Sequence, residues 1–479
     1  MSGSSPPAAE PGAAGARLAV GAAYAVLGIA LLWSRLFELG HSFWTDEVLM
    51  ISAYVREGPG EILAGPGLSH ELLALLTWAT GTVTGESEVA FRLWSAVPFV
   101  AGVVLVAAWL HVRLGPLSGV LFMFLSVVSP LLLDITRQAR GYGLAFFAMS
   151  VLVVAALEAH RTGRTWAVVA MCAGGVVGTW TLPQVGIAFL ASGAALSVDR
   201  RVRRPTLVGL VASIAAIVAW YAPHIAAVRS SSQVADGVHF AFPWVATAPI
   251  DQILLPALLW IDGTVILAGV VWLPLVLLAV IVIAASPLMR DRVSALILCA
   301  GVVVTIVVLW IGQAYVIPRY LSYLLVPSFV LVATGAASIL GRMTRRPALL
   351  RTVVCLVVIL LLAVRFAQIA PDVVALPREA NRDAAEVIEA QGTSTTVLTY
   401  MRNPQNLAFY LGRSVEDLRD ADIAKVVCGQ STAVFYVMQP FALEDVAVPC
   451  LGRPGVEHYR FRQYARGDEM NVWFVPPAT

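Results

Sequence analysis

The sequence predicts a polytopic α-helical membrane protein with a small C-terminal α/β domain. Of its 479 residues, 59% are hydrophobic and only 13% are charged, whereas a soluble domain averages about 25% charged residues. About eleven apolar stretches approach the ~20 residues that a helix needs to cross the hydrocarbon core of a bilayer. The net charge of +2 is too small to indicate a protein that binds nucleic acid.

The N-terminal residues 1–16 are small and rich in proline, and we interpret them as a disordered cytoplasmic tail. No small-residue cleavage site follows a short apolar core, so we interpret the first apolar stretch as a membrane span and not as a signal peptide. A transmembrane domain is therefore predicted over residues 17–368. Its predicted spans are 18–38, 90–112, 116–133, 141–160, 165–181, 183–198, 206–228, 264–286, 293–312, 321–341 and 349–368.

Arginine is concentrated in alternate loops between these spans, and the positive-inside rule places such loops in the cytoplasm. This alternation predicts a plasma-membrane protein with a cytoplasmic N-terminus and an extracytoplasmic C-terminus. The outer loops are then 39–89, 134–140, 182–184, 229–263 and 313–320. The loops predicted to be cytoplasmic contain Arg113, Arg161, Arg164, Arg200, Arg201, Arg203, Arg204, Arg290, Arg292, Arg342, Arg345, Arg346 and Arg351.

The first outer loop, residues 39–89, places Asp46 and Glu47 on the outer side of the membrane. We predict two helices in this loop, over Thr45–Arg56 and His70–Thr82, both lying along the membrane surface. The acidic pair has two interpretations. Partial desolvation at the interface strengthens a carboxylate as a general base, or the pair only caps the first helix. The two roles are compatible, because a cap also fixes the direction of the carboxylate.

A second group of polar residues lies where the third predicted span ends and the fourth begins. Arg137, Arg140 and Tyr142 fall on the predicted outer side. A guanidinium group at this depth is typical of a site that binds a phosphate or a carboxylate. The alternative is an ion pair with Asp134 that only ties the loop together.

Arg319 and Tyr320 open the tenth predicted span on the same side. Arg319 is placed to hold the phosphate of a lipid whose tail lies in the bilayer, or it extends to the lipid headgroups. His70 and Asp46 are two potential metal ligands without the spacing of a metal site, so neither a metal nor another cofactor is indicated.

Residues 369–479 are more polar and predict the extracytoplasmic α/β domain. An amphipathic helix is predicted over 381–391, with strands over 396–400, 433–437, 456–464 and 471–475. Cys428 and Cys450 lie in this segment, where an oxidising compartment permits a disulfide. Two free thiols in a small core are the alternative.

The ordered motifs on the outer side resemble the GT-C glycosyltransferases that use lipid-phosphate sugars, among them the bacterial relatives of protein O-mannosyltransferases and of the aminoarabinose transferase. The resemblance extends to about residue 340. It departs from the family where Gly65–His70 replaces a His-Pro-Pro motif and where Gln138 replaces an acid. The motifs that carry it are the acidic pair Asp46–Glu47, the run Glu86–Ala96, Ser129–Leu131 with Arg137–Tyr142, and Arg319–Leu321 with Pro327.

The resemblance implies inverting transfer of a sugar from a polyprenyl-phosphate donor to a hydroxyl of a glycan, lipid or protein. Mannose or another hexose is favoured, and arabinofuranose is the rival. A transporter or flippase for a lipid-linked glycan is the alternative, although it predicts ionisable residues near the bilayer midplane. A third possibility is a structural scaffold, but that function would leave the acidic pair Asp46–Glu47 unexplained. The implied roles are catalysis for Asp46 and Glu47, binding of the donor phosphate for Arg137, Arg140 and Arg319, and substrate binding for His70, Tyr142 and Tyr320.

Overall fold

A computed structural model describes the chain as two compact units. The first unit comprises residues 1–37, 58–86 and 90–365, and the second comprises 38–57, 87–89 and 366–479. The residues described are 13–37, 39–40, 43, 45–64, 70–230, 280–311, 318–342, 347–374, 381–392, 395–400, 404–418, 423–438, 448–462 and 469–477. Most of the predicted tail, nearly all of the predicted outer loop 229–263 and most of the predicted span 264–286 lie outside them.

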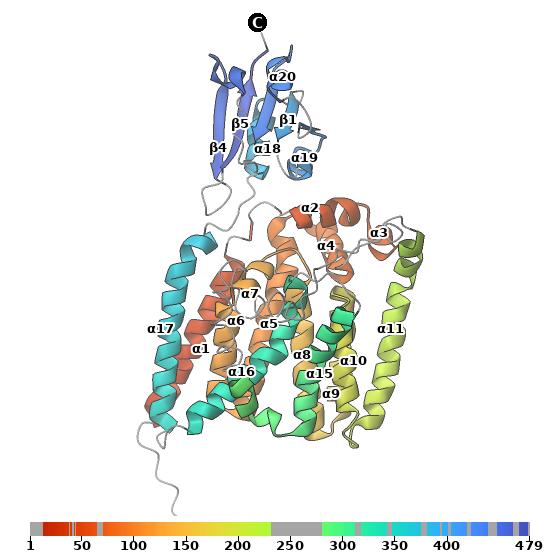
Figure 1. Cartoon of the computed structure of the whole chain (residues 1–479), viewed down its shortest axis with the longest axis vertical. Coiled ribbons are helices and arrows are strands. Elements are labelled where there is room, and N and C mark those ends of the chain that lie inside the picture. The colour runs from red at the N-terminus through yellow and green to blue at the C-terminus, as the bar shows by residue number, and fades with distance from the viewer. Residues whose placement is uncertain are drawn as a thin grey trace, which may run out of the picture. The chain divides into compact units, whose positions relative to one another are not determined.

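Helices make up the first unit (Figure 1). Each described span begins within a few residues of its predicted start. The helices, of which α5 begins and α17 ends in residues of the second unit, are α1 (Ala13–Leu36), α3 (Pro59–Ala64), α4 (Glu71–Thr84), α5 (Glu88–Leu114), α6 (Pro116–Val128), α7 (Pro130–Ile135), α8 (Tyr142–Thr162), α9 (Thr165–Thr181), α10 (Val185–Leu196), α11 (Arg203–Ser230), η3 (Pro287–Met289), α15 (Arg292–Ile311), η4 (Pro318–Leu324), α16 (Leu325–Arg342) and α17 (Pro347–Val374).

Within the described residues, five helical segments are long and apolar enough to cross a membrane, and five further apolar helices are shorter. Two predicted spans differ from the structure in their local form. The stretch 116–133 is broken at Ser129, because the proline that follows disfavours helical geometry at the residue before it. The stretch 321–341 begins as the 3₁₀ helix η4 and becomes an α-helix only at Leu325.

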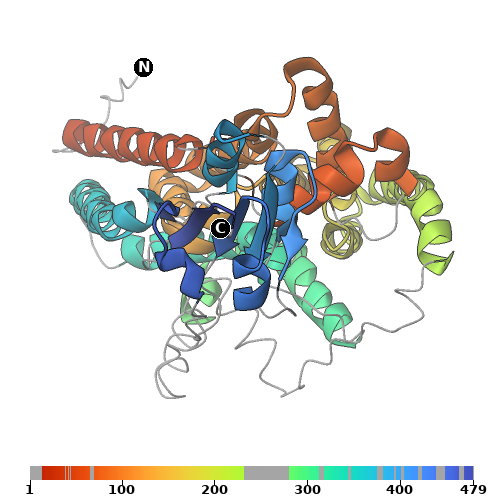
Figure 2. The same cartoon turned by 90° about the horizontal axis from the view of Figure 1, so that it is seen from above.

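The helices of the first unit pack both with their neighbours in sequence and with helices far along the chain. α8 packs against α9, α10 against α15, and α6 against both α1 and α16. Seen from above, α1 lies across the view whereas α9 and α10 are nearly end-on, so the helices differ in tilt (Figure 2). A Cβ atom added to Gly143 of α8 would overlap the carbonyl oxygen of Ser95, so glycine permits the close approach of α8 to α5.

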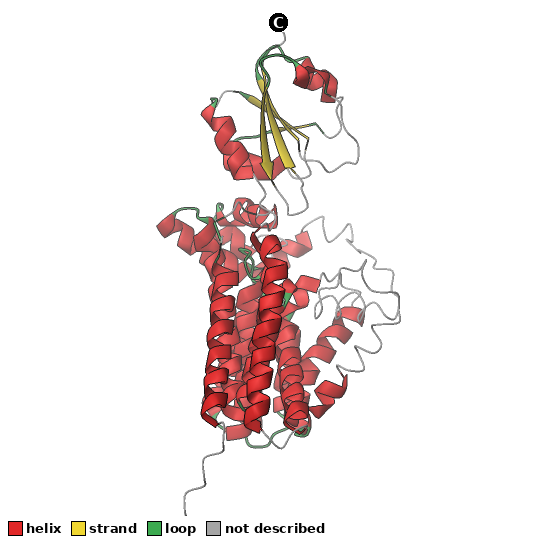
Figure 3. Ribbon diagram, turned by 90° about the vertical axis from the view of Figure 1, so that its left-hand side faces the viewer, coloured by secondary structure: helices red, strands yellow, loops and turns green. Residues whose placement is uncertain are grey.

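The second unit combines two segments of the N-terminal half with the C-terminal part of the chain. The predicted first helix of the outer loop is observed as α2 (Thr45–Met50) followed by one π-helical turn, η1 (Ile51–Val55). The C-terminal part forms the described strands of the unit (Figure 3). Its elements are α18 (Asn381–Ala390), β1 (Thr396–Tyr400), α19 (Pro404–Leu411), β2 (Glu416–Asp417), α20 (Ile423–Cys428), β3 (Val434–Met438), η5 (Pro449–Gly452), β4 (Glu457–Arg462) and β5 (Glu469–Val475).

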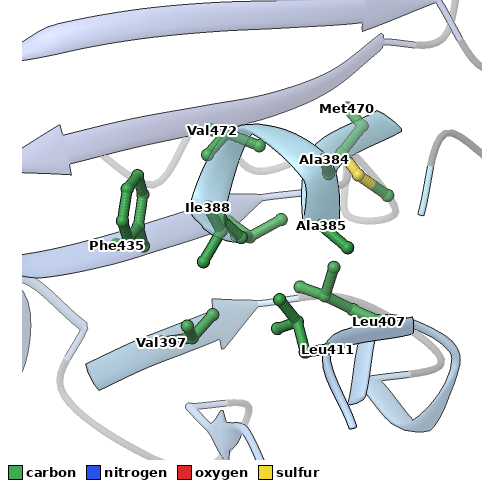
Figure 4. Close-up of a cluster of buried hydrophobic side chains, with 10 residues drawn as sticks. Ala384, Ala385, Ile388, Val397, Leu407, Leu411, Phe435, Met470 and Val472 are labelled. Atoms are coloured by element: carbon green, nitrogen blue, oxygen red, sulfur yellow. The ribbon is translucent and has the colours of Figure 1, made fainter. Parts of the chain in front are cut away.

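The strands form one mixed sheet in the order β2-β1-β3-β5-β4. β1 runs parallel to β2 and to β3, whereas β5 runs antiparallel to β3 and to β4. One face is covered by α18 and α19, whose apolar side chains pack on β1, β3 and β5 (Figure 4). Cys428 and Cys450 form the disulfide that the sequence left open. β1 is observed as predicted, β3 is shifted by one residue, and β2, α19 and α20 are additions.

Candidate active site

Three aromatic rings that the sequence singled out lie together in the first unit. The rings of His70 and Tyr142 are 5.1 Å apart and meet edge to face. The ring of Tyr142 is 6.3 Å from the ring of Tyr320. Tyr142 therefore joins the start of α4 to the 3₁₀ helix η4, although these elements are far apart in sequence.

A guanidinium group accompanies each of the two tyrosines. That of Arg140 lies 5.3 Å from the ring centre of Tyr142, and that of Arg319 lies 5.9 Å from the ring centre of Tyr320. Both distances fall within the range of a cation–π contact. We call His70, Arg140, Tyr142, Arg319 and Tyr320 the arginine–aromatic cluster.

Arg137 belongs to the same loop as Arg140 and is equally withdrawn from solvent. It is only 3% exposed, and its Nη2 atom donates a hydrogen bond to the carbonyl oxygen of Phe37 at 2.8 Å. Arg140 is 8% exposed. The loop therefore buries two guanidinium groups close together in sequence, and burying a cation is costly unless anions or polar groups compensate its charge. The side chain of Asp134, the alternative partner predicted above, lies outside the described residues.

Gly141 allows the loop before α8 to approach His70 closely. Gly141 immediately precedes α8, and a Cβ atom added there would lie 2.6 Å from Cγ2 of Thr181 and 2.9 Å from Nδ1 of His70. Distances this short do not occur between a real side chain and its neighbours. The absence of a side chain at Gly141 therefore allows the loop, α4 and the end of α9 to meet at one point.

His70 is held as a neutral imidazole with a defined tautomer. Its Nδ1 atom lies 3.3 Å from the carbonyl oxygen of Thr181, which only accepts hydrogen bonds. Nδ1 therefore carries the proton, and Nε2 has the lone pair. Burial, followed by the positive charge of Arg140 and then Arg319, lowers the pKa of His70 well below its ordinary value. Nε2 is buried and makes no hydrogen bond with any described residue, so it is suited to a hydroxyl group of a ligand.

Glu71, the residue after His70, is a buried carboxyl group beside the cluster. Burial raises the pKa of Glu71 to about 7. The hydroxyl of Tyr221 lies 3.4 Å from Glu71 Oε2 and donates to the carbonyl oxygen of Thr179 at 2.6 Å. The sequence analysis did not single out Glu71, although its position beside His70 in the first turn of α4 was the available signal.

Asp46 and Glu47 lie in the second unit, in the first turn of α2. Asp46 is half-buried, whereas Glu47 is fully buried. The residues around α2 are fixed by α19. The backbone N–H of Phe43 donates to the hydroxyl of Tyr410 at 2.6 Å, and the guanidinium of Arg56 lies 4.0 Å from the ring centre of Phe409.

The structure thus brings five of the predicted residues together in the first unit as the arginine–aromatic cluster, with Arg137 in the same loop. It places the two predicted catalytic carboxylates in the second unit. Thr181 and Tyr221 were not predicted, because a backbone carbonyl and a helix tyrosine have no recognisable sequence signal. Among the described residues, no three His, Cys, Asp or Glu side chains are arranged to hold a metal ion.

Comparison with known proteins identifies the fold. ArnT from Cupriavidus metallidurans in the apo state is similar with a TM-score of 0.56 and 14% identity, over 95% of this chain and 97% of that chain. ArnT bound to undecaprenyl phosphate gives a TM-score of 0.52 at 14% identity over the same shares. The archaeal oligosaccharyltransferase AglB from Archaeoglobus fulgidus, in complex with an inhibitory peptide and a dolichol-phosphate, gives 0.50 at 10% identity, over 88% of this chain and 69% of that chain.

Neither a protein-family model nor a curated protein sequence matches the chain. At identities of 10–14%, the structural likeness establishes the fold alone. ArnT and AglB are both GT-C glycosyltransferases. The chain therefore has the fold of the GT-C glycosyltransferases, as the order of its sequence motifs predicted.

Proposed function

We propose that the chain is a membrane-embedded inverting glycosyltransferase that moves a sugar from a polyprenyl-phosphate donor to a hydroxyl acceptor. The observation that carries this proposal is the arginine–aromatic cluster, in which Arg140 and Arg319 each lie over one of two neighbouring tyrosine rings beside a neutral histidine. The fold supports it, since ArnT binds undecaprenyl phosphate in its solved complex and AglB binds dolichol-phosphate.

In the proposed reaction, the arginines bind the donor phosphate. When the bond between the anomeric carbon and the phosphate oxygen breaks, the leaving polyprenyl phosphate gains negative charge. Arg140 and Arg319, with Arg137 in the same loop, are cations held in fixed positions before this charge develops. Preorganised cations stabilise such a transition state without having to move. Tyr142 and Tyr320 position these guanidinium groups and contact the substrate.

Asp46 is the proposed general base. It removes the proton of the acceptor hydroxyl as the oxygen attacks the anomeric carbon from the face opposite the phosphate, which inverts the configuration. Glu47 is its neighbour in the site. His70 binds a hydroxyl of the substrate through its Nε2 lone pair, because Nδ1 is committed to the carbonyl of Thr181.

The alternation of arginine in the loops supports an orientation with the N-terminus inside and about eleven spans. The arginine–aromatic cluster, Asp46 and the C-terminal domain over 369–479 then lie on the outer side of the plasma membrane. Mannose or another hexose is the proposed sugar, with arabinofuranose as its rival, and the acceptor is a glycan, a lipid or a protein.

Sugar transfer by the purified chain in nanodiscs tests the proposal directly. Synthetic polyprenyl-phosphate mannose and polyprenyl-phosphate arabinofuranose serve as donors, with acceptor glycans from cell envelopes. We expect transfer by the wild type and a loss of about 100-fold or more in Asp46→Asn. Glu61→Gln, which changes an exposed acid in α3, is the matched control and keeps full activity.

Full activity of Asp46→Asn would remove that residue as the base. A wild type that transfers neither sugar, yet moves a fluorescent lipid-linked glycan across the bilayer, would favour the flippase.

A further inference from the structure

A cavity of about 280 Å³ lies in the first unit, away from the arginine–aromatic cluster. It is formed where the junction of α5 and α6 meets η3, the last turns of α16 and the first turns of α17. Its walls include Ser118, Pro287, Ser338, Gly341 and Arg351. The volume is just below that of ordinary small-molecule pockets and fits the headgroup of a phospholipid better than a whole ligand of drug size.

Arg351 gives this cavity a positive charge. Its side chain is half-buried on the first turns of α17, and no described residue forms a hydrogen bond or an ion pair with it. Ser338 also lines the cavity, and its hydroxyl has no hydrogen-bond partner among the described residues. The cavity therefore offers a cation and a hydroxyl donor that no residue in the described part of the chain engages.

The acids of the neighbouring loops do not compensate this charge, because they are engaged elsewhere. Glu158 forms ion pairs with Arg113 and Arg161. Asp291, four residues after Pro287 of the cavity wall, bonds to His160 at 2.8 Å and to Ser294. An anion that enters the cavity meets Arg351 without competition from these carboxylates.

Apolar surface adjoins the charged cavity. Leu114, Leu117 and Leu350 line the cavity together with Arg351. A ligand with an anionic head and an apolar body matches this combination. Basic pockets between transmembrane helices on the cytoplasmic side are typical binding places for anionic lipid headgroups.

We propose that this cavity binds the phosphodiester headgroup of an anionic phospholipid from the leaflet on the arginine-rich side of the membrane. The headgroup phosphate accepts hydrogen bonds from Arg351 and Ser338, and the acyl chains leave the cavity beside Leu114, Leu117 and Leu350 of its wall. The bound lipid joins α6, α16 and α17, of which α16 directly follows η4 with Arg319.

Lipid binding to the full chain tests this proposal. The purified protein, in a mild detergent, is titrated with phosphatidylglycerol or phosphatidylcholine and examined by native mass spectrometry. We expect the wild type to retain phosphatidylglycerol and Arg351→Gln to bind it at least fivefold more weakly, in keeping with about 1 kcal/mol for each arginine at an anionic surface. Arg351→Lys restores part of the binding. Arg342→Gln, which removes an exposed cation at the end of α16 outside the cavity wall, stays within twofold of the wild type.

A second variant fills the cavity without changing the charge. Gly341 belongs to the cavity wall, and no atom lies within 4 Å of a Cβ atom added there, so Gly341→Leu adds a bulky side chain at the cavity without a clash at Cβ. We expect it to lose phosphatidylglycerol as Arg351→Gln does, with an unchanged elution volume and melting temperature.

Two results would overturn the proposal. One is equal binding of phosphatidylglycerol by the wild type, Arg351→Gln and Gly341→Leu. The other is displacement of the lipid by millimolar inorganic phosphate, which would make a free anion the ligand. Neither result depends on sugar transfer, so the proposed catalytic function is tested separately.

Discussion

The Nδ1 atom of His70 lies 3.3 Å from the backbone carbonyl oxygen of Thr181. Because a carbonyl oxygen has no proton to give, this contact determines the tautomer of a ring whose other nitrogen is buried beside Arg140 and Arg319. A histidine surrounded in this way stays neutral where an exposed histidine begins to take up a proton.

The first prediction concerns the pH dependence that follows from this neutral ring. Since the pKa of His70 is lowered in the folded protein, the unfolded chain takes up a proton near the ordinary value of about 6.5 while the folded chain does not. Stability from this group is present above pH 6.5 and is lost as the pH falls below it. In nanodiscs, the melting temperature of the wild type should therefore fall further between pH 7.5 and pH 5.5 than the melting temperature of His70→Gln. Parallel curves for the two proteins would contradict a neutral His70.

The second prediction concerns the donor. Arg319→Ala should raise the KM for the polyprenyl-phosphate sugar by about 10- to 100-fold, because a hydrogen bond between charged groups contributes about 1.5–3 kcal/mol. The KM for the acceptor should change little. The donor KM of Arg319→Lys should lie between those of the wild type and Arg319→Ala, since lysine keeps the charge and loses the planar geometry of the guanidinium. Arg200→Ala, an exposed arginine, is the control, and equal changes in both KM values would argue against a phosphate-binding role.

The third prediction concerns Glu71, whose pKa is raised to about 7 by burial. As the pH rises from 4.5 to 7, the unfolded chain releases this proton and the folded chain retains it, so stability from the protonated group is progressively lost. Glu71→Gln does not titrate and should melt roughly 5 °C above the wild type at pH 8, with a smaller difference at pH 5. Glu61→Gln should show no such trend. If the melting temperatures of Glu71→Gln and the wild type differ by the same amount at both pH values, Glu71 does not titrate in this range.

The fourth prediction concerns the disulfide between Cys428 and Cys450, which closes a loop with a sequence separation of 22. A loop of this length restricts the unfolded chain by about 3 kcal/mol. Replacing both cysteines by serine should lower the unfolding temperature of the C-terminal sheet, and a reductant should lower that of the wild type to the same value. Cys299→Ala, at a free cysteine of α15, should leave the response to reductant intact. A reductant that has no effect on the wild type would contradict the prediction.

Local patterns predicted the helices and the polar loops well, because hydropathy and charge act over one or two helical turns. The aromatic and guanidinium residues of the loop before α8 were identified for this reason. The contact of His70 with Thr181 joins positions 111 residues apart, and no local pattern encodes such a pairing. The short elements α19, β2 and α20 were missed because a few residues are too few to show a periodicity.

The sequence also did not allow us to predict that α2 belongs to the second unit. The segment around Asp46 was predicted to lie along the membrane surface on the strength of its apolar face. Its observed partners are Tyr410 and Phe409, of which Tyr410 bonds to Phe43 across 367 positions. Such a pairing depends on the shape of α19, which apolar spacing near Asp46 does not reveal.

This long-range pairing has a consequence for how the protein is made. Phe43 precedes Tyr410 of α19 (Pro404–Leu411) by 367 positions, so the segment around Asp46 is synthesised long before its partner. The helices of the first unit are therefore synthesised before the tyrosine hydroxyl that accepts the hydrogen bond from the N–H of Phe43. A protease that cuts the nascent chain ahead of α19 would leave the helices of the first unit with an Asp46–Glu47 segment that lacks its contacts with Tyr410 and Phe409.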